Sequence, residues 1–100
     1  MIFQPQTKSG EIYERNPHIK WQVIEGKVVL VDSLEGELLH LNELGTRIWQ
    51  KLSGASSLKE ILDELSQELD VPFKKLQKDV AKFIHELCQM ELVRESRKNS

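Results

Sequence analysis

The side chains best suited to carry out chemistry in this sequence are a histidine and a cysteine placed three residues apart. His85 and Cys88 fall in a segment with helical periodicity, where residues at i and i+3 share a face. A zinc site needs three or four such ligands, and the other histidines, His18 and His40, form no second cluster with them. We therefore interpret the pair as structural or incidental, and the sequence predicts neither a metal nor any other cofactor.

Motifs of known catalytic mechanism are also missing from the sequence. There is no glycine-rich phosphate loop, no zinc-protease helix and no nucleophile elbow. Glu35 and Glu37 flank a turn glycine and are expected to face water. Serine, histidine and aspartate all occur, but their spacing does not indicate a triad. The sequence therefore offers no positive case for an enzyme.

A stripe of lysines marks the last predicted helix. Lys75, Lys78 and Lys82 lie at i, i+3 and i+7, so they share a face that could meet phosphates or an acidic peptide, or simply face solvent. A small sheet followed by three helices can be a winged helix-turn-helix, which makes DNA binding the alternative function. Asp79 and Glu86 on the same helix, and a net charge of −2, argue against nucleic acid.

Length and composition indicate one globular domain. The chain has 100 residues, of which 39% are apolar, and its single cysteine excludes an internal disulfide. No apolar run approaches the roughly 20 residues that span a bilayer, and residues 1–18 lack the apolar core of a signal peptide. We expect a cytoplasmic protein without membrane contact.

The first half of the chain predicts three antiparallel strands. Apolar and polar residues alternate over residues 19–24, Glu25-Gly26 is a turn signal, and residues 27–33 form a second apolar strand. A second predicted turn at residues 33–36 leads into a third strand at residues 37–41. Short connections of this kind are typical of an antiparallel meander.

Helical periodicity begins directly after the third strand. Asn42 is a suitable N-cap for a first helix, and Gly54 a suitable C-cap. Ser57 and Glu60 form a capping box for a second helix, and Pro72 suits the first turn of a third, longer one. The sequence therefore predicts an α+β fold, a three-stranded antiparallel sheet followed by three helices.

The ends of the chain are more polar than this central part. We expect a flexible N-terminal arm at residues 1–17, a single domain at residues 18–93 and a polar C-terminal tail at residues 94–100.

The third strand is short, apolar and placed at the expected edge of the sheet. Its exposed backbone groups could pair with another chain, either a peptide or a second copy of this protein in a homodimer. Alternation places Leu39 with Leu41 on one face and Leu38 with His40 on the other. Which of these pairs faces the helices stays open.

Over residues 17–93 the sequence resembles the PqqD-like family, beginning with the run PHIKWQVIEGKVVLVDSLEGELLHLNELGTRIWQKLSGASSLKEILDEL. The matching features are Leu41-Asn42, Ile48-Trp49, Leu52 with Gly54, the segment Ser57 through Glu60-Ile61, Asp79-Val80, Phe83-Ile84, Leu87 and Leu92-Val93.

The resemblance implies a winged-helix-like fold and a peptide chaperone, also called a RiPP recognition element, that is not itself a catalyst. Such proteins bind the leader of a ribosomally made precursor peptide and present it to a modifying enzyme, often a radical SAM enzyme, or in lasso-peptide systems to a leader peptidase. The leader adds as a strand beside the third strand and lies against the third helix. The peptide-binding residues expected on this basis are Glu37, Leu38, Leu39, His40, Leu41, Lys75, Lys78, Asp79, Lys82 and Phe83.

Overall fold

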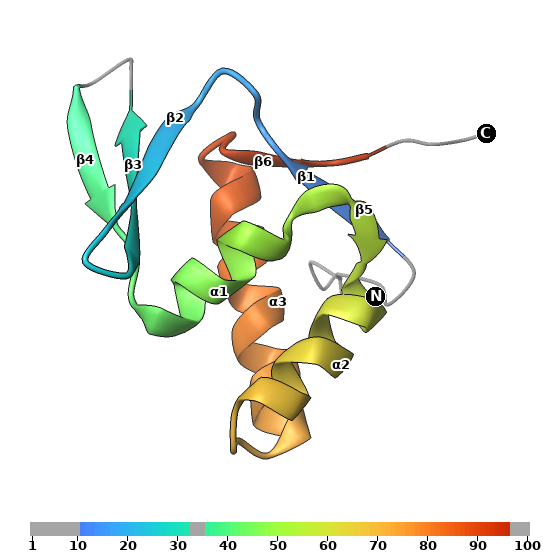
Figure 1. The fold of residues 1–100 in the computed structure, drawn as a ribbon. Helices are drawn as coiled ribbons and strands as arrows, with labels where there is room; N and C mark the ends of the chain where they lie inside the picture. Colours follow the sequence, from blue (N-terminus) through green and yellow to red (C-terminus); the bar gives the residue numbers. More distant parts are fainter. Residues whose placement is uncertain (1–10, 33–35, 97–100) are drawn as a thin grey trace.

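The fold combines two small antiparallel sheets with three helices (Figure 1). The structure, a computed structural model, describes residues 11–32 and 36–96. Its elements in chain order are β1 (Ile12–Arg15), β2 (Lys20–Ile24), β3 (Lys27–Asp32), β4 (Glu37–His40), α1 (Glu43–Lys51), β5 (Ser53–Ser57), α2 (Leu58–Glu68), α3 (Phe73–Gln89) and β6 (Val93–Glu95).

The three predicted strands form the expected meander. β2, β3 and β4 pair antiparallel in that order, so β4 is an edge strand. The β2–β3 turn places both Glu25 and Gly26 at positive φ, 53° and 82°, which is the geometry of a type I′ hairpin turn. The meander prediction is therefore confirmed, while most of the turn predicted at residues 33–36 lies outside the described residues.

A second sheet joins the two ends of the described chain. β1 is its central strand and pairs antiparallel with β5 on one side and β6 on the other. The expectation of a loose arm is therefore wrong for Ile12–Arg15, and the first residues of the expected polar tail belong to β6. Residues 1–10 of that arm lie outside the described residues.

The ends of α1 and α2 follow the predicted signals at three positions and depart from them at one. The Asn42 side chain accepts a 2.7 Å hydrogen bond from the Gly45 amide, and Ser57 and Glu60 form both bonds of a capping box. The prediction of Gly54 as a C-cap is wrong, because α1 ends at Lys51 with Leu52 as its C-cap, and Gly54 lies within β5 at a φ of 88°.

The core lies where the three helices meet the inner face of β3. Val28 and Leu30 of β3 pack with Ile48 and Trp49 of α1, all of them fully buried. Thr46 links these layers, because its buried hydroxyl accepts a 2.9 Å hydrogen bond from the Val28 amide. Thus α1 is held against the sheet by both packing and a hydrogen bond.

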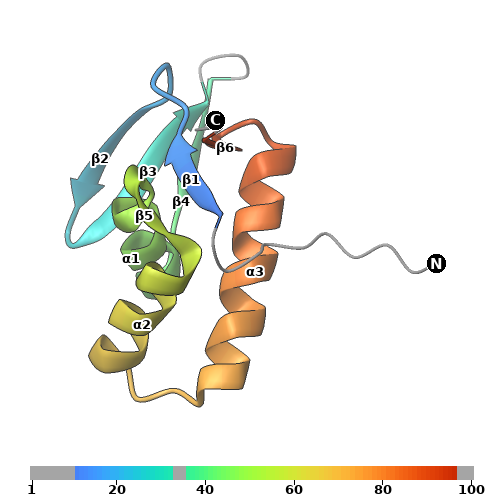
Figure 2. The same ribbon diagram turned by 90° about the vertical axis from the view of Figure 1, so that its right-hand side faces the viewer.

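The long helix α3 supports the rest of the fold. It stands beside α2, and the strands gather toward its C-terminal end (Figure 2). Its buried face is apolar at helical spacing, with Leu76, Val80, Ile84 and Leu87. No helix in the described part of the chain is both long and apolar enough to cross a membrane.

Candidate functional site

The outer edge of β4 exposes backbone hydrogen-bonding groups. β3 is its one neighbour among the described strands, and in Figure 1 β4 forms the border of the sheet. The Leu41 amide donates to the Val28 carbonyl at 2.9 Å, so it points toward β3. Because successive residues of a regular strand alternate in direction, the N–H and C=O groups of Leu38 and His40 point away from β3, toward the open edge.

The structure also settles which β4 side chains face inward. Leu39 and Leu41 pack against the core, whereas Leu38 is 57% exposed and His40 is exposed on the opposite face of the sheet. The strand therefore seals the core with one set of alternating residues. The other set, Leu38 and His40, carries both the backbone groups that point to the open edge and the exposed side chains.

A cavity of about 240 Å³ is lined by residues of both α1 and α3, and we call it the Phe83 cavity. It is lined by Asn42, Leu44, Gly45, Ile48, Asp79, Lys82, Phe83 and Glu86. Phe83 is half-buried and packs against the core. Its ring lies so close to α1 that a Cβ added at Gly45 would be 3.1 Å from the Phe83 Cζ atom.

A second cavity of about 340 Å³ lies beside the first, toward the α2–α3 connection, and we call it the Leu76 cavity. Its lining is Asn42, Glu43, Leu44, Leu69, Val71, Lys75, Leu76 and Asp79. Because Asn42, Leu44 and Asp79 line both cavities, the two lie next to each other between α1 and α3. The apolar side chains make the Leu76 cavity suited to an aliphatic or aromatic group.

The lysine stripe of α3 is partly neutralised. Lys75 forms a 2.9 Å ion pair with Asp79, one helical turn away. Lys78 and Lys82 are exposed; Lys82 lines the Phe83 cavity, and Lys78 lines neither cavity. The predicted residues of α3 therefore divide into a group around the two cavities and one lysine that faces solvent.

The thiol of Cys88 is not activated by its surroundings. Burial raises the pKa of the half-buried Cys88 thiol, and the negative charge of Glu95 adds to this effect, so the thiol is held neutral. Among the described residues there is no group of three His, Cys, Asp or Glu side chains arranged to hold a metal ion. The raised pKa of Cys88 disfavours a reactive thiolate at this position.

Sequence reasoning did not place α1 in the site. Leu44 and Gly45 form the wall of the Phe83 cavity opposite α3, and Glu86 adds a second carboxylate to Asp79. A usable signal was present, because glycine inside a helix costs about 1 kcal/mol relative to alanine and often marks a close contact.

Comparison with known proteins identifies the family. The family described as Coenzyme PQQ synthesis protein D (PqqD) matches residues 27–93. A search of curated protein sequences found no match.

Two solved structures share the fold. One, "TbiB1 in Complex with the TbiA(beta) Leader Peptide", has a TM-score of 0.74 and 25% identity, and the alignment covers 85% of this chain and 99% of that one. The other, "Lasso peptide synthetase B1 complexed with the leader peptide", has a TM-score of 0.72 and 23% identity, and the alignment covers 82% and 96% of the two chains. Because the family match at residues 27–93 spans more than half of the sequence, this chain belongs to the PqqD family.

Proposed function

We propose that this protein binds the leader segment of a ribosomally synthesised precursor peptide as an additional strand beside β4. The open edge of β4, in a fold whose solved neighbours are described as leader-peptide complexes, is the observation that carries the proposal. The leader would pair with the backbone of residues 37–41 and contact Lys75, Lys78, Asp79, Lys82 and Phe83 of α3.

Backbone pairing alone is too weak to account for such a complex. Leu38 and His40 each offer one N–H and one C=O group, and four hydrogen bonds at about 0.5–1.5 kcal/mol give roughly 2–6 kcal/mol. A micromolar complex needs about 8 kcal/mol after the peptide has been ordered. Leader side chains must supply the remainder, and the Phe83 and Leu76 cavities offer apolar surface for them.

The bound leader would then be presented to a modifying enzyme, either a radical SAM enzyme or a leader peptidase. In this proposal the chain acts as a non-catalytic recognition module on a winged-helix-like scaffold. DNA binding is not favoured, because Lys75 is engaged with Asp79 and two carboxylates line the Phe83 cavity on the same helix.

The test is a titration of ¹⁵N-labelled protein with the leader encoded by the precursor reading frame next to its gene. We expect chemical-shift changes at the amides of residues 37–41 and along residues 75–86. The largest changes should occur at Leu38 and His40, whose backbone groups point to the open edge. A scrambled leader of the same composition is the control, and spectra that stay flat with the correct leader would refute the proposal.

A further inference from the structure

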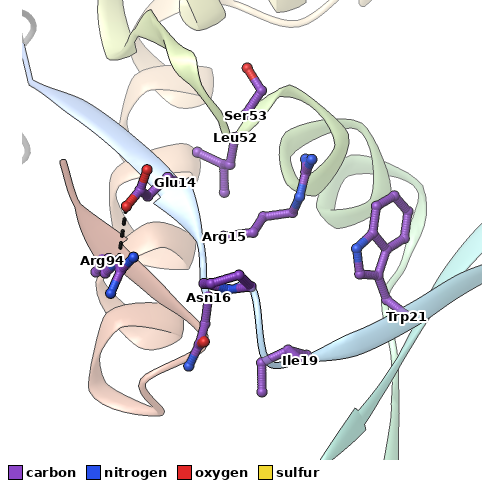
Figure 3. A pocket seen from close by; sticks show the side chains of 9 residues that line it. Glu14, Arg15, Asn16, Ile19, Trp21, Leu52, Ser53 and Arg94 are labelled. Carbon is purple, nitrogen blue, oxygen red and sulfur yellow. Dashed lines mark hydrogen bonds and ion pairs between the residues drawn. The ribbon is translucent and has the colours of Figure 1, made fainter.

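A separate pocket of about 310 Å³ lies where β1 turns toward β2, and we call it the Arg15 pocket (Figure 3). It is lined by Glu14, Arg15, Asn16, Pro17, Ile19, Trp21, Leu52, Ser53 and Arg94. Part of this lining comes from the β2 side of the meander, at the edge opposite β4. None of its residues lines the Phe83 or Leu76 cavity.

The Arg15 guanidinium is held in place on two sides. Its Nη1 atom donates to the carbonyl oxygens of Trp49 at 2.8 Å and Gln50 at 3.2 Å, near the C-terminal end of α1. Its central carbon lies 5.1 Å from the Trp21 ring centroid and 6.0 Å from that of Trp49. Both contacts are favourable for a cation and orient the planar group within the pocket.

The charge of Arg15 lacks a carboxylate partner among the described residues. Glu14, the nearest acid along the chain, forms a 2.8 Å ion pair with Arg94 on the opposite side of the pocket, as Figure 3 shows. The hydrogen bonds of Arg15 in the described structure use only Nη1. Partial burial lowers its pKa by desolvation, a cost that a bound anion would offset.

We infer that the Arg15 pocket binds an acidic side chain of the protein that receives the leader. This inference rests on the proposed function, because a protein that presents a peptide must contact the peptide and the receiving enzyme at the same time. Since β2 and β4 are opposite edges of the sheet, a bound leader strand would leave the pocket free. A guanidinium with an open donor edge is suited to a carboxylate.

Another surface hollow has less capacity for such a contact. A cavity of about 330 Å³ beside α1 is lined in part by Glu25, Glu43 and Arg47. There Arg47 is already paired with Glu43 at 3.2 Å and with Glu68 at 3.0 Å, so its charge is satisfied within the chain. The Arg15 pocket is thus the better site for an external carboxylate.

The test uses N-acetyl-L-glutamate as the probe and its neutral analogue N-acetyl-L-glutamine as the control. Each is titrated at low ionic strength into ¹⁵N-labelled full-length protein. With the glutamate we expect shifts of the Arg15 Nε–H, the Trp21 indole and the Ser53 amide, at affinity about tenfold higher than with the glutamine. Equal responses to both compounds, or no response at these groups, would overturn the inference.

A pair of variants separates binding at Arg15 from general charge effects without removing the arginine. Ser53→Glu adds a carboxylate at the exposed pocket wall, and Gln67→Glu adds the same charge on the exposed face of α2. We expect Ser53→Glu to weaken probe binding about fivefold or more, because its own carboxylate competes for the guanidinium, and Gln67→Glu to leave it unchanged. Equal effects of both variants would overturn the inference.

The leader titration provides an independent readout. Ser53→Glu should leave leader binding at β4 intact. If the probe binds and the leader does not, the carboxylate site stands and leader binding is refuted. If the leader binds and the probe does not, leader binding stands and the carboxylate site is refuted.

Discussion

A Cβ atom added at Gly45 would lie 3.1 Å from Cζ of Phe83 and 3.1 Å from Oδ1 of Asn42. This is closer than the contacts that side chains normally accept, so the missing side chain at Gly45 lets α1 approach α3. The same position donates its amide to the Asn42 cap. The absence of a side chain at position 45 thus leaves room for both the Asn42 cap and the Phe83 ring.

We expect Gly45→Ala to be destabilising in spite of the better helix propensity of alanine. Propensity favours alanine by about 1 kcal/mol, but the new methyl group must displace the Phe83 ring. In a Phe83→Leu background the same change should be less unfavourable, with a coupling of at least ~0.5 kcal/mol in a double-mutant cycle measured by urea unfolding. Additive effects would show that a methyl group at position 45 does not clash with the Phe83 ring.

Thr46 offers a test of how the sheet is attached to α1. Thr46→Val keeps the shape but removes the acceptor of the buried Val28 N–H group. An unpaired buried donor costs about 1–3 kcal/mol, so urea unfolding should show a loss of that size. Thr46→Ser is the matched control, because it keeps the hydroxyl and loses only a methyl group. A valine variant as stable as the wild type would contradict the role of the hydrogen bond.

Neighbouring leucines of β4 should respond differently to truncation. Leu39 packs against the core and Leu38 is 57% exposed. Leu39→Ala should therefore lower the free energy of unfolding by about 2 kcal/mol, whereas Leu38→Ala should change it by less than ~0.5 kcal/mol. Chemical denaturation of the two variants checks the inward face of the strand, and the reverse order would contradict the observed register.

The backbone of His40 can be tested separately from its side chain. His40→Pro removes an N–H group that points to the open edge, where proline is tolerated within a sheet. We expect leader affinity to fall about fivefold or more in fluorescence anisotropy, since one hydrogen bond is lost and the ring obstructs pairing. His40→Ala keeps the N–H group and should bind nearly as well as wild type. Equal affinities of both variants would argue against strand addition.

Tyr13 provides a pH-dependent readout of the second sheet. Burial, assisted by the negative charge of Glu95, raises the pKa of Tyr13 from 10.0 to about 12. The folded protein therefore retains the phenol proton above the pH at which the unfolded chain loses it. The contribution of Tyr13 to stability is complete below pH 10 and is lost as the pH rises from 10 to about 12.

This titration can be followed directly, because Tyr13 is the only tyrosine in the sequence. Absorbance near 295 nm should give a midpoint close to 12 in the folded protein and an ordinary value in urea. Tyr13→Phe should flatten the alkaline loss of stability. An unshifted midpoint in the folded protein would show that β1 is not docked as described.

The predictable parts of this fold are those with local signals. A hairpin turn with glycine, alternating apolar residues and two side-chain caps define β2, β3 and the starts of α1 and α2. The second sheet has no such signal. The β5 sequence SGASS has low strand propensity. The strand forms because its backbone pairs closely with that of β1. A Cβ at Gly54 would meet the Glu14 side chain at 3.1–3.2 Å, so glycine is needed there for pairing rather than for ending a helix.

The candidate site was predictable to a similar extent. The β4 edge follows from the order of the strands along the chain, and the α3 residues follow from helical spacing. The inward face of β4 could not be deduced, because both alternating sets include leucine. The part played by Leu44 and Gly45 depends on how α1 crosses α3, a relation between distant segments that no local pattern records.

The pairing of β1 with β6 also constrains the order in which the molecule can assemble. Glu14 and Arg94 are joined across it although 80 residues separate them along the chain. The β2–β3–β4 meander and α1 are contiguous in sequence and can close with little loss of chain entropy, whereas β1 can pair with β6 only after synthesis has passed Glu95. During translation the β4 edge can therefore form before the strand that ties the two ends of the domain together.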